Sequence, residues 1–145
     1  MCQDMNICKF NNEKCSLNGY TIGQTYSVLG FEKTDSGRFV CGEPKQFTIG
    51  FNKEGVCDGF SMVFRGSDSK LPSFTGKMIY EGKKIEINVL ITPDEVRSIL
   101  GSETDDEWND EVEINLQYLL GDYLIEFSWD KEKNNTLSYV DVGYD

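Results

Sequence analysis

The stretch of this sequence with the most obvious chemistry is an acidic run that contains one tryptophan. Six carboxylates lie within the nine residues Glu103–Glu111, and Trp108 stands among them. Clustered carboxylates pair with arginine and lysine on a basic partner and accelerate encounter, and a tryptophan can supply the buried contact that carries affinity. The run predicts a partner-binding surface made of Glu103, Asp105, Asp106, Glu107, Trp108, Asp110, Glu111 and Glu113.

Two other interpretations of the acidic run remain open. It is compatible with a solvated loop whose Trp108 packs back onto the core. It could also hold a cation, but it lacks the glycine and the alternate-ligand spacing of an EF-hand loop, so we expect no metal ion there.

A second acidic surface is expected on the hairpins that follow. Strand alternation would carry the charge of the run onto an outward face if the side chains point the same way. Outward charges on a sheet also serve solubility and edge protection alone. The residues concerned are Glu111, Glu113, Glu126, Asp130 and Asp141.

Residues suited to catalysis are scarce. The chain has no histidine, which removes the Ser-His-Asp and Cys-His arrangements and imidazole acid–base chemistry. Neither a GxxxxGK[ST] phosphate loop nor a GxGxxG fingerprint occurs. A glycosidase can work with two carboxylates, but no pair stands out among 25 acidic residues. We therefore expect no enzyme, no catalytic residue and no cofactor.

The charge is concentrated in the second half of the chain. The net charge is −11, and residues 73–145 carry all of it, because acidic and basic residues balance in residues 1–72. Such a field repels nucleic acid and anionic membranes and attracts a basic protein. The aromatic residues alternate along strands and are expected in the core rather than on a base-stacking platform: Phe47, Phe51, Phe60, Phe64, Phe127 and Tyr139.

One helix is well marked. Thr92 is suited to the N-cap, Pro93 to the first helical position, and Glu95 completes a capping box. Gly101 can end the helix after the apolar positions 96, 99 and 100. A shorter counterpart of about one turn is expected at residues 25–29.

Strand patterns fill most of the remainder. Residues 112–120 and 123–130 alternate around the hairpin turn Gly121-Asp122, and residues 47–51 and 60–64 alternate likewise. Residues 47–54 resemble residues 125–132 at an offset of 78, which indicates an internal repeat. We predict a β-rich α+β fold with two similar halves, residues 1–70 and 71–145. Each half has a short helix and about three to five antiparallel strands, and the two form one compact unit.

The five cysteines are odd in number and lack paired CxxC spacing. We expect mostly reduced thiols in a cytoplasmic protein, with a Cys8–Cys15 disulfide as the alternative. No signal peptide or membrane helix is visible. Cys2 leaves open a cell-envelope lipoprotein whose leader was removed.

The segment from Thr92-Pro93-Asp94-Glu95-Val96 to Leu100-Gly101, with the strand pairs after it, resembles the β-lactamase-inhibitor-protein type of fold. That fold packs a short helical segment of each repeat against an antiparallel sheet. The likeness covers about two thirds of the chain, and the sequence departs from the secreted inhibitors in lacking a leader and an evident pair of disulfides.

The chain is also similar to immunity proteins of contact-dependent or polymorphic toxin systems, in its size, its acidity and its lack of histidine. The resemblance implies a cytoplasmic protein that binds a basic nuclease toxin and covers its active site. A cell-envelope lipoprotein or a structural or assembly module is the alternative function.

Overall fold

The computed structural model describes residues 7–10, 15–42, 46–65, 73–80, 83–101, 111–120 and 123–144. These residues form two β-sheets, the helix α1 (Pro93–Leu100) and the short 3-10 helix η2 (Lys131–Lys133). Neither helix in this part of the chain reaches the length and apolar character that crossing a membrane requires. The β-rich α+β class predicted from the sequence is confirmed.

The larger sheet has seven strands in the order β10-β11-β12-β7-β6-β5-β4, and each neighbouring pair is antiparallel. Its strands are β4 (Glu32–Lys33), β5 (Phe39–Cys41), β6 (Phe47–Phe51), β7 (Cys57–Val63), β10 (Glu113–Leu120), β11 (Tyr123–Asp130) and β12 (Thr136–Tyr144). The predicted hairpin of residues 112–130 is confirmed in its strands, while its turn at residues 121–122 lies outside the described residues.

The smaller sheet has five strands in the order β3-β2-β1-β8-β9. They are β1 (Ile7–Phe10), β2 (Cys15–Leu17), β3 (Tyr20–Thr21), β8 (Gly76–Tyr80) and β9 (Lys83–Ile87). The expectation of purely antiparallel strands is wrong here, because β1 and β8 run parallel. A parallel pair needs a long crossover, and the chain between these two strands builds four of the seven strands of the larger sheet.

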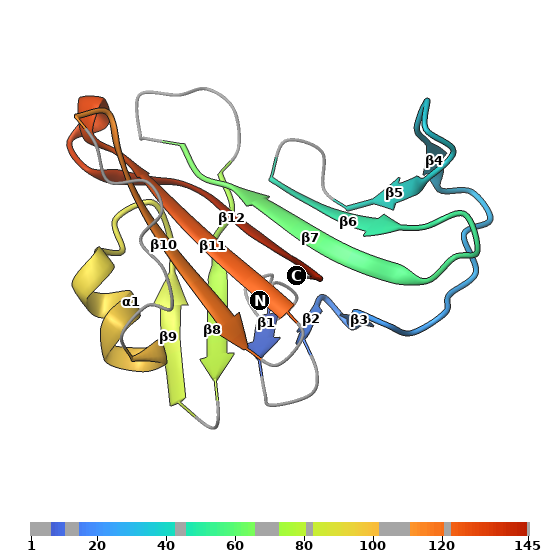
Figure 1. Cartoon of the computed structure of the whole chain (residues 1–145), viewed down its shortest axis with the longest axis horizontal. Coiled ribbons are helices and arrows are strands. Elements are labelled where there is room, and N and C mark those ends of the chain that lie inside the picture. Colours follow the sequence, from blue (N-terminus) through green and yellow to red (C-terminus); the bar gives the residue numbers. More distant parts are fainter. Residues whose placement is uncertain are drawn as a thin grey trace.

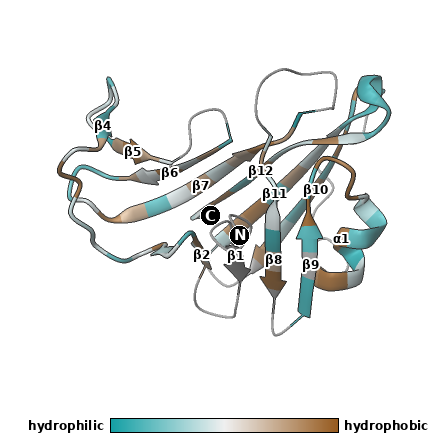
Figure 2. Cartoon of the chain, turned by 180° about the vertical axis from the view of Figure 1, so that it is seen from behind, coloured by the Kyte–Doolittle hydropathy of each residue, from teal (hydrophilic) through white to brown (hydrophobic). Residues whose placement is uncertain are grey.

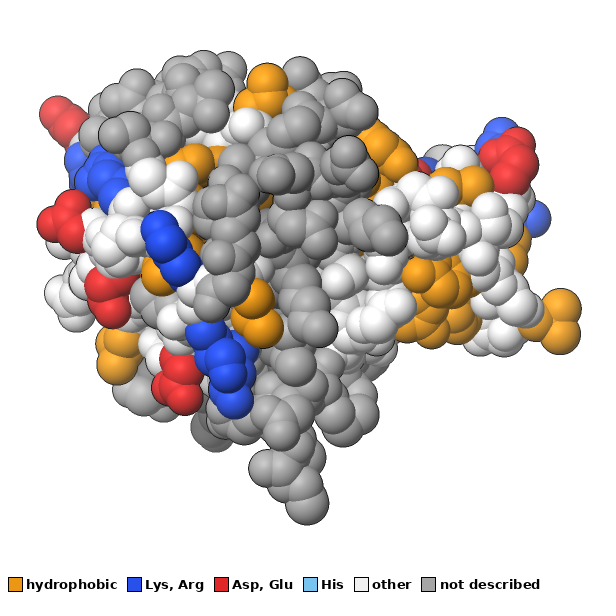
Figure 3. Space-filling model, turned by 90° about the horizontal axis from the view of Figure 1, so that it is seen from below, with side chains coloured by type: hydrophobic (Ala, Val, Ile, Leu, Met, Phe, Trp, Pro, Cys, Tyr) orange, Lys and Arg blue, Asp and Glu red, His pale blue; other side chains and the backbone are white. Residues whose placement is uncertain are grey.

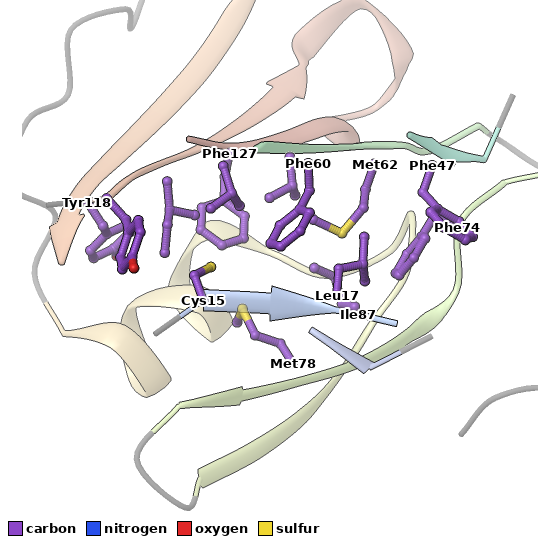
Figure 4. Close-up of a cluster of buried hydrophobic side chains, with 14 of the residues drawn as sticks. Cys15, Leu17, Phe47, Phe60, Met62, Phe74, Met78, Ile87, Tyr118 and Phe127 are labelled. Atoms are coloured by element: carbon purple, nitrogen blue, oxygen red, sulfur yellow. The ribbon is translucent and has the colours of Figure 1, made fainter. Parts of the chain in front are cut away.

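The two sheets pack face to face around one core (Figure 1). Figure 4 shows Cys15, Leu17, Met78 and Ile87 of the smaller sheet pointing toward side chains of the larger one. Figure 2 shows hydrophobic and hydrophilic residues following one another along several strands, as half-buried strands require. The core side of the larger sheet is therefore covered, and its other side forms an outer face.

The internal repeat predicted from residues 47–54 and 125–132 coincides with two hairpins in the larger sheet. The β6–β7 and β11–β12 hairpins lie next to one another, because β7 pairs with β12. Val140 of β12 is opposite Met62 of β7, and Val142 is opposite Phe60. All four side chains are buried, so the middle of this sheet contributes directly to the core.

Helix α1 begins and ends as the sequence indicates. The Thr92 hydroxyl accepts from the Glu95 backbone N–H at 3.2 Å, and the Glu95 carboxylate accepts from the Thr92 N–H at 3.1 Å. Gly101 has a φ of 83° and donates its N–H to Arg97 O at 2.8 Å. Val96 is buried, and helix and sheet are joined by a hydrogen bond from the Tyr118 hydroxyl to Gly101 O at 2.9 Å.

The second predicted helix, at residues 25–29, does not form. Thr25 instead makes an isolated bridge with Val56, and the Tyr26 N–H donates to Gly55 O at 2.9 Å. Gly23 and Gly30, with φ of 92° and 88°, bracket the segment. One turn of helix fixes several dihedrals for a single hydrogen bond, so a short segment without caps is better satisfied by pairing with a neighbour. The prediction of two halves that each contain a helix is therefore wrong.

Strands β4 to β6 extend the larger sheet past the smaller one (Figure 1). An aromatic cluster covers the core side of this extension, where the Phe51 ring lies 5.5 Å from Tyr20, 6.0 Å from Tyr26 and 5.2 Å from Phe31 between centroids. Figure 3, the view from below, shows hydrophobic side chains gathered at this end. At the opposite end it shows positive and negative side chains interspersed.

Two expectations stay predictions: the division of the chain into residues 1–70 and 71–145, and the alternative of a Cys8–Cys15 disulfide. Both sheets take strands from either side of the division into residues 1–70 and 71–145, and the boundary itself lies outside the described residues. In the β1–β2 pair the register places Leu17, not Cys15, opposite Cys8.

Candidate partner-binding face

The acidic hairpin residues gather on the outer face of the larger sheet. In the register of β10, β11 and β12, Glu113 is opposite Asp130, and Glu126 is opposite Asp141. Their neighbours Leu116, Phe127 and Val140 alternate to the core side and are buried. Strand alternation therefore places all four carboxylates on one face, as the sequence predicted for Glu113, Glu126, Asp130 and Asp141.

A tyrosine and a glutamine hold the central carboxylate of this face. The Gln117 amide donates to Glu126 Oε2 at 2.8 Å, and the Tyr139 hydroxyl donates to Glu126 Oε1 at 3.1 Å. Gln117 comes from β10, Glu126 from β11 and Tyr139 from β12. One side chain from each of the two strands that flank β11 thus fixes the position of Glu126.

Asp141 is held from the other side. The Ser61 hydroxyl of β7 donates to Asp141 Oδ1 at 2.7 Å, and the two residues are opposite one another in the register. In the described part of the chain, Asp141 Oδ2 has no hydrogen-bond partner. Asp141 therefore has one anchored oxygen and one available acceptor.

The electrostatics of the outer face follow from its partial burial. Burial raises the pKa of the Tyr139 hydroxyl to about 12, and the negative charge of Glu126 contributes. Burial also raises the pKa of Asp141, while the hydrogen bond from Ser61 offsets part of the shift and the charge of Glu126 adds to it. Neighbouring carboxylates on a half-buried face favour a cationic partner.

A buried amide lies among these acids. Asn115 is opposite Ser128, between the Glu113–Asp130 pair and the Gln117–Glu126 pair. Asn115 is 2% exposed, and its Oδ1 accepts no hydrogen bond from the residues that the structure describes. Buried polar atoms are normally paired, so this acceptor is an exception that calls for a donor.

The outer face ends in an ion pair toward β5. Arg38 donates to Asp58, and both side chains lie over Gly50, where a Cβ would come within 2.8 Å of Arg38 Nη2. This aspartate is thus matched by its own cation. An open groove of about 450 Å³ at the β4–β5 hairpin has a mixed charge and is lined by Lys33, Thr34, Asp35, Ser36, Gly37, Phe39 and Lys53.

The acidic run predicted as the centre of the binding surface lies mostly outside the described residues: Glu103, Asp105, Asp106, Glu107, Trp108 and Asp110. Glu111 is exposed just before β10, and Glu113 belongs to the outer face. In the described part of the chain no group of three or more Asp, Glu, Cys or His residues is arranged to hold a metal ion.

Sequence reasoning placed one residue of the outer face in the wrong environment. Tyr139 was expected in the core with the phenylalanines, but it is only half-buried and its hydroxyl bonds Glu126. Val140 and Val142 take the core positions of β12, so Tyr139 must face outward. The five phenylalanines of that prediction are buried as expected. Asn115 and Gln117 could have been found from their alternation with Leu116 and Tyr118.

Comparisons with known proteins return little. No protein-family model matches the sequence, and no curated protein matches it. Among solved structures, the chain is similar to YjgB, a DUF4309 family protein from Bacillus subtilis subsp. subtilis str. 168, with a TM-score of 0.46 and 15% identity. That match covers 79% of this chain and 68% of the YjgB chain.

Proposed function

We propose that this chain is a protein-binding inhibitor, an immunity protein whose acidic surface covers a basic protein toxin such as a nuclease. The observation that carries the proposal is the set of carboxylates on the outer face. Glu113, Glu126, Asp130 and Asp141 come from three adjacent strands and lie on the side of the sheet opposite the core.

The arrangement suits inhibition because the acids are both clustered and rigid. Glu126 and Asp141 accept three hydrogen bonds from Gln117, Tyr139 and Ser61, so little side-chain entropy is left to lose on binding. Acidic clusters attract a basic surface over a distance and suppress wrong partners. A nuclease binds the phosphate backbone of its nucleic-acid substrate with basic residues. An acidic sheet bound to those residues would exclude the nucleic acid.

The acidic run belongs to the same proposal. Glu111 and Glu113 connect the run to the first strand of the outer face. The proposal assigns the carboxylates of residues 103–110 to the attraction of a basic partner and Trp108 to an apolar contact with it.

The proposal is tested by capture of a partner at two salt concentrations. The tagged chain is used to pull down proteins from cells that express the neighbouring gene. We expect a stoichiometric basic protein at low salt and its release at high salt, because screening weakens exposed charge pairs. Absence of any partner at low salt, or a partner whose binding ignores salt, would contradict the proposal.

A charge-reversal variant separates the acidic run from the outer face. Replacing Asp105, Asp106 and Glu107 by Lys should slow association and reduce its salt sensitivity if the run takes part. If binding is unchanged, the run has no role in it, and the outer face must account for the salt dependence.

A further inference from the structure

We propose that Tyr139 and Asp141 form a seat for an arginine side chain on the outer face. The inference rests on the proposed function and names the side chain by which a basic partner is held. We expect this site to bind the guanidinium group of arginine more tightly than the ammonium group of lysine.

The spacing of the two residues suits a guanidinium group. Tyr139 and Asp141 are alternate residues of β12, so both point outward with their Cα atoms about 7 Å apart. A guanidinium group stacks on an aromatic face within about 6 Å of the ring centroid. From that position its N–H groups reach a carboxylate next to the ring, as in stacked and bidentate arginine sites.

Both side chains are held in place before a partner arrives. The Tyr139 hydroxyl bonds Glu126 at 3.1 Å, and the Asp141 carboxylate accepts from Ser61 at 2.7 Å. Fixing the ring and the carboxylate in advance lowers the entropy cost of binding. The seat is thus preorganised by β7 and β11, the two strands that flank β12.

Two acceptor oxygens of the outer face have no partner among the described residues. Asp141 Oδ2 is unpartnered in the described part of the chain, and the 98% buried Asn115 has an unpartnered Oδ1. Asn115 is opposite Ser128, the residue that Tyr139 faces across β11 and β12. Asn115 is buried and two strands away from Tyr139, so only Asp141 offers its free oxygen next to the ring. An open acceptor next to an aromatic ring suits a ligand with several N–H donors, and guanidinium has five.

The alternatives fit less well. A metal ion would need ligands closer together, and the described residues contain no such group of three. A lysine ammonium is a compact, strongly hydrated charge that gains less from a ring than a guanidinium does. The raised pKa of Asp141 is consistent with a carboxylate that lacks its cation.

The test uses two peptides of the same length and charge, one rich in arginine and one rich in lysine. Binding to the intact chain is followed by NMR, through the ring signals of Tyr139 and the backbone amide signal of Asp141. We expect the arginine peptide to shift both sets of signals saturably and to bind about two- to fivefold more tightly than the lysine peptide.

Variants assign the preference to the seat. Tyr139→Leu should abolish the arginine preference, whereas Tyr139→Phe keeps the ring and should retain it. The Asp141→Asn side chain can still accept a hydrogen bond from Ser61, so this variant should fold. It should bind the arginine peptide about two- to fivefold more weakly. Glu86→Gln, which removes an exposed acid on the smaller sheet, is the matched control and should change neither peptide's binding.

The outcomes distinguish this inference from the proposed function. Equal binding of both peptides, or a preference that survives in Tyr139→Leu, overturns the arginine seat even if a basic protein partner is captured. Binding of the arginine peptide as expected supports the seat even if no protein partner is found. Failure to find a protein partner would overturn the proposed function alone.

Discussion

At the scale of single residues, the outer face holds carboxylates under conditions that do not favour their charge. Asp141 is half-buried, lies opposite Glu126 and, among the described residues, has one hydrogen-bond donor, Ser61. Its pKa is raised mainly by burial, so the charged form costs folding free energy at neutral pH. A group kept at such a cost is better explained by binding than by stability.

The pH dependence of Asp141 has a definite sign. Its folded-state pKa lies above the ordinary value of 3.8, so the folded state binds the proton more tightly than the unfolded state. Its contribution to stability is therefore complete below the unfolded pKa and is lost as the pH rises through the folded pKa. Neutralising Asp141 should remove this loss.

We predict that Asp141→Asn raises the free energy of unfolding at pH 7 and leaves it unchanged below about pH 3, where the native carboxyl is protonated in both states. Urea unfolding across this pH range measures the difference. Glu132→Gln, an exposed acid in η2, serves as control. Lower stability of Asp141→Asn at pH 7 would show that the charge of Asp141 stabilises the fold.

At the scale of elements, local signals were predictable and distant pairings were not. The cap at Thr92, the capping box with Glu95 and the stop at Gly101 lie within ten residues, so the sequence alone locates α1. The acids of the outer face were predictable for the same reason, because alternation within a hairpin fixes which residues share a face. The parallel β1–β8 pair joins residues far apart in the chain, and no local pattern encodes it.

The link between α1 and the larger sheet gives a prediction at this scale. Trp129 of β11 is fully buried, and its indole N–H donates to Ile91 O, just before α1, at 2.8 Å. Trp129→Phe leaves that carbonyl without its donor, so it should lower the free energy of unfolding by about 2 kcal/mol. Tyr144→Phe, a change at a half-exposed aromatic residue, should cost under about 0.5 kcal/mol. Similar urea midpoints for the two variants would contradict this role of Trp129.

At the scale of the whole molecule, the fold separates the core side of the large sheet from an outer side that is partly exposed, with Asn115, Gln117 and Ser128 buried. The smaller sheet and α1 cover the core side, and the acids of β10, β11 and β12 occupy the other. The asymmetry of charge between the two halves of the chain was evident in the sequence. The sequence did not establish that these acidic side chains point to the same side of the sheet. The assignment of Tyr139 to that side required the register of β12.

The central claim is that the acids of the outer face, and not the net charge, drive binding of a basic partner. It is tested most directly with two triple variants that remove the same charge. Glu113→Gln, Glu126→Gln and Asp130→Asn change the outer face, and Asp35→Asn, Glu54→Gln and Glu86→Gln change exposed acids elsewhere. The measurement is the association rate with the captured partner at low salt. We predict about a tenfold slower rate for the first variant and a much smaller change for the second. Equal slowing in both would contradict the account.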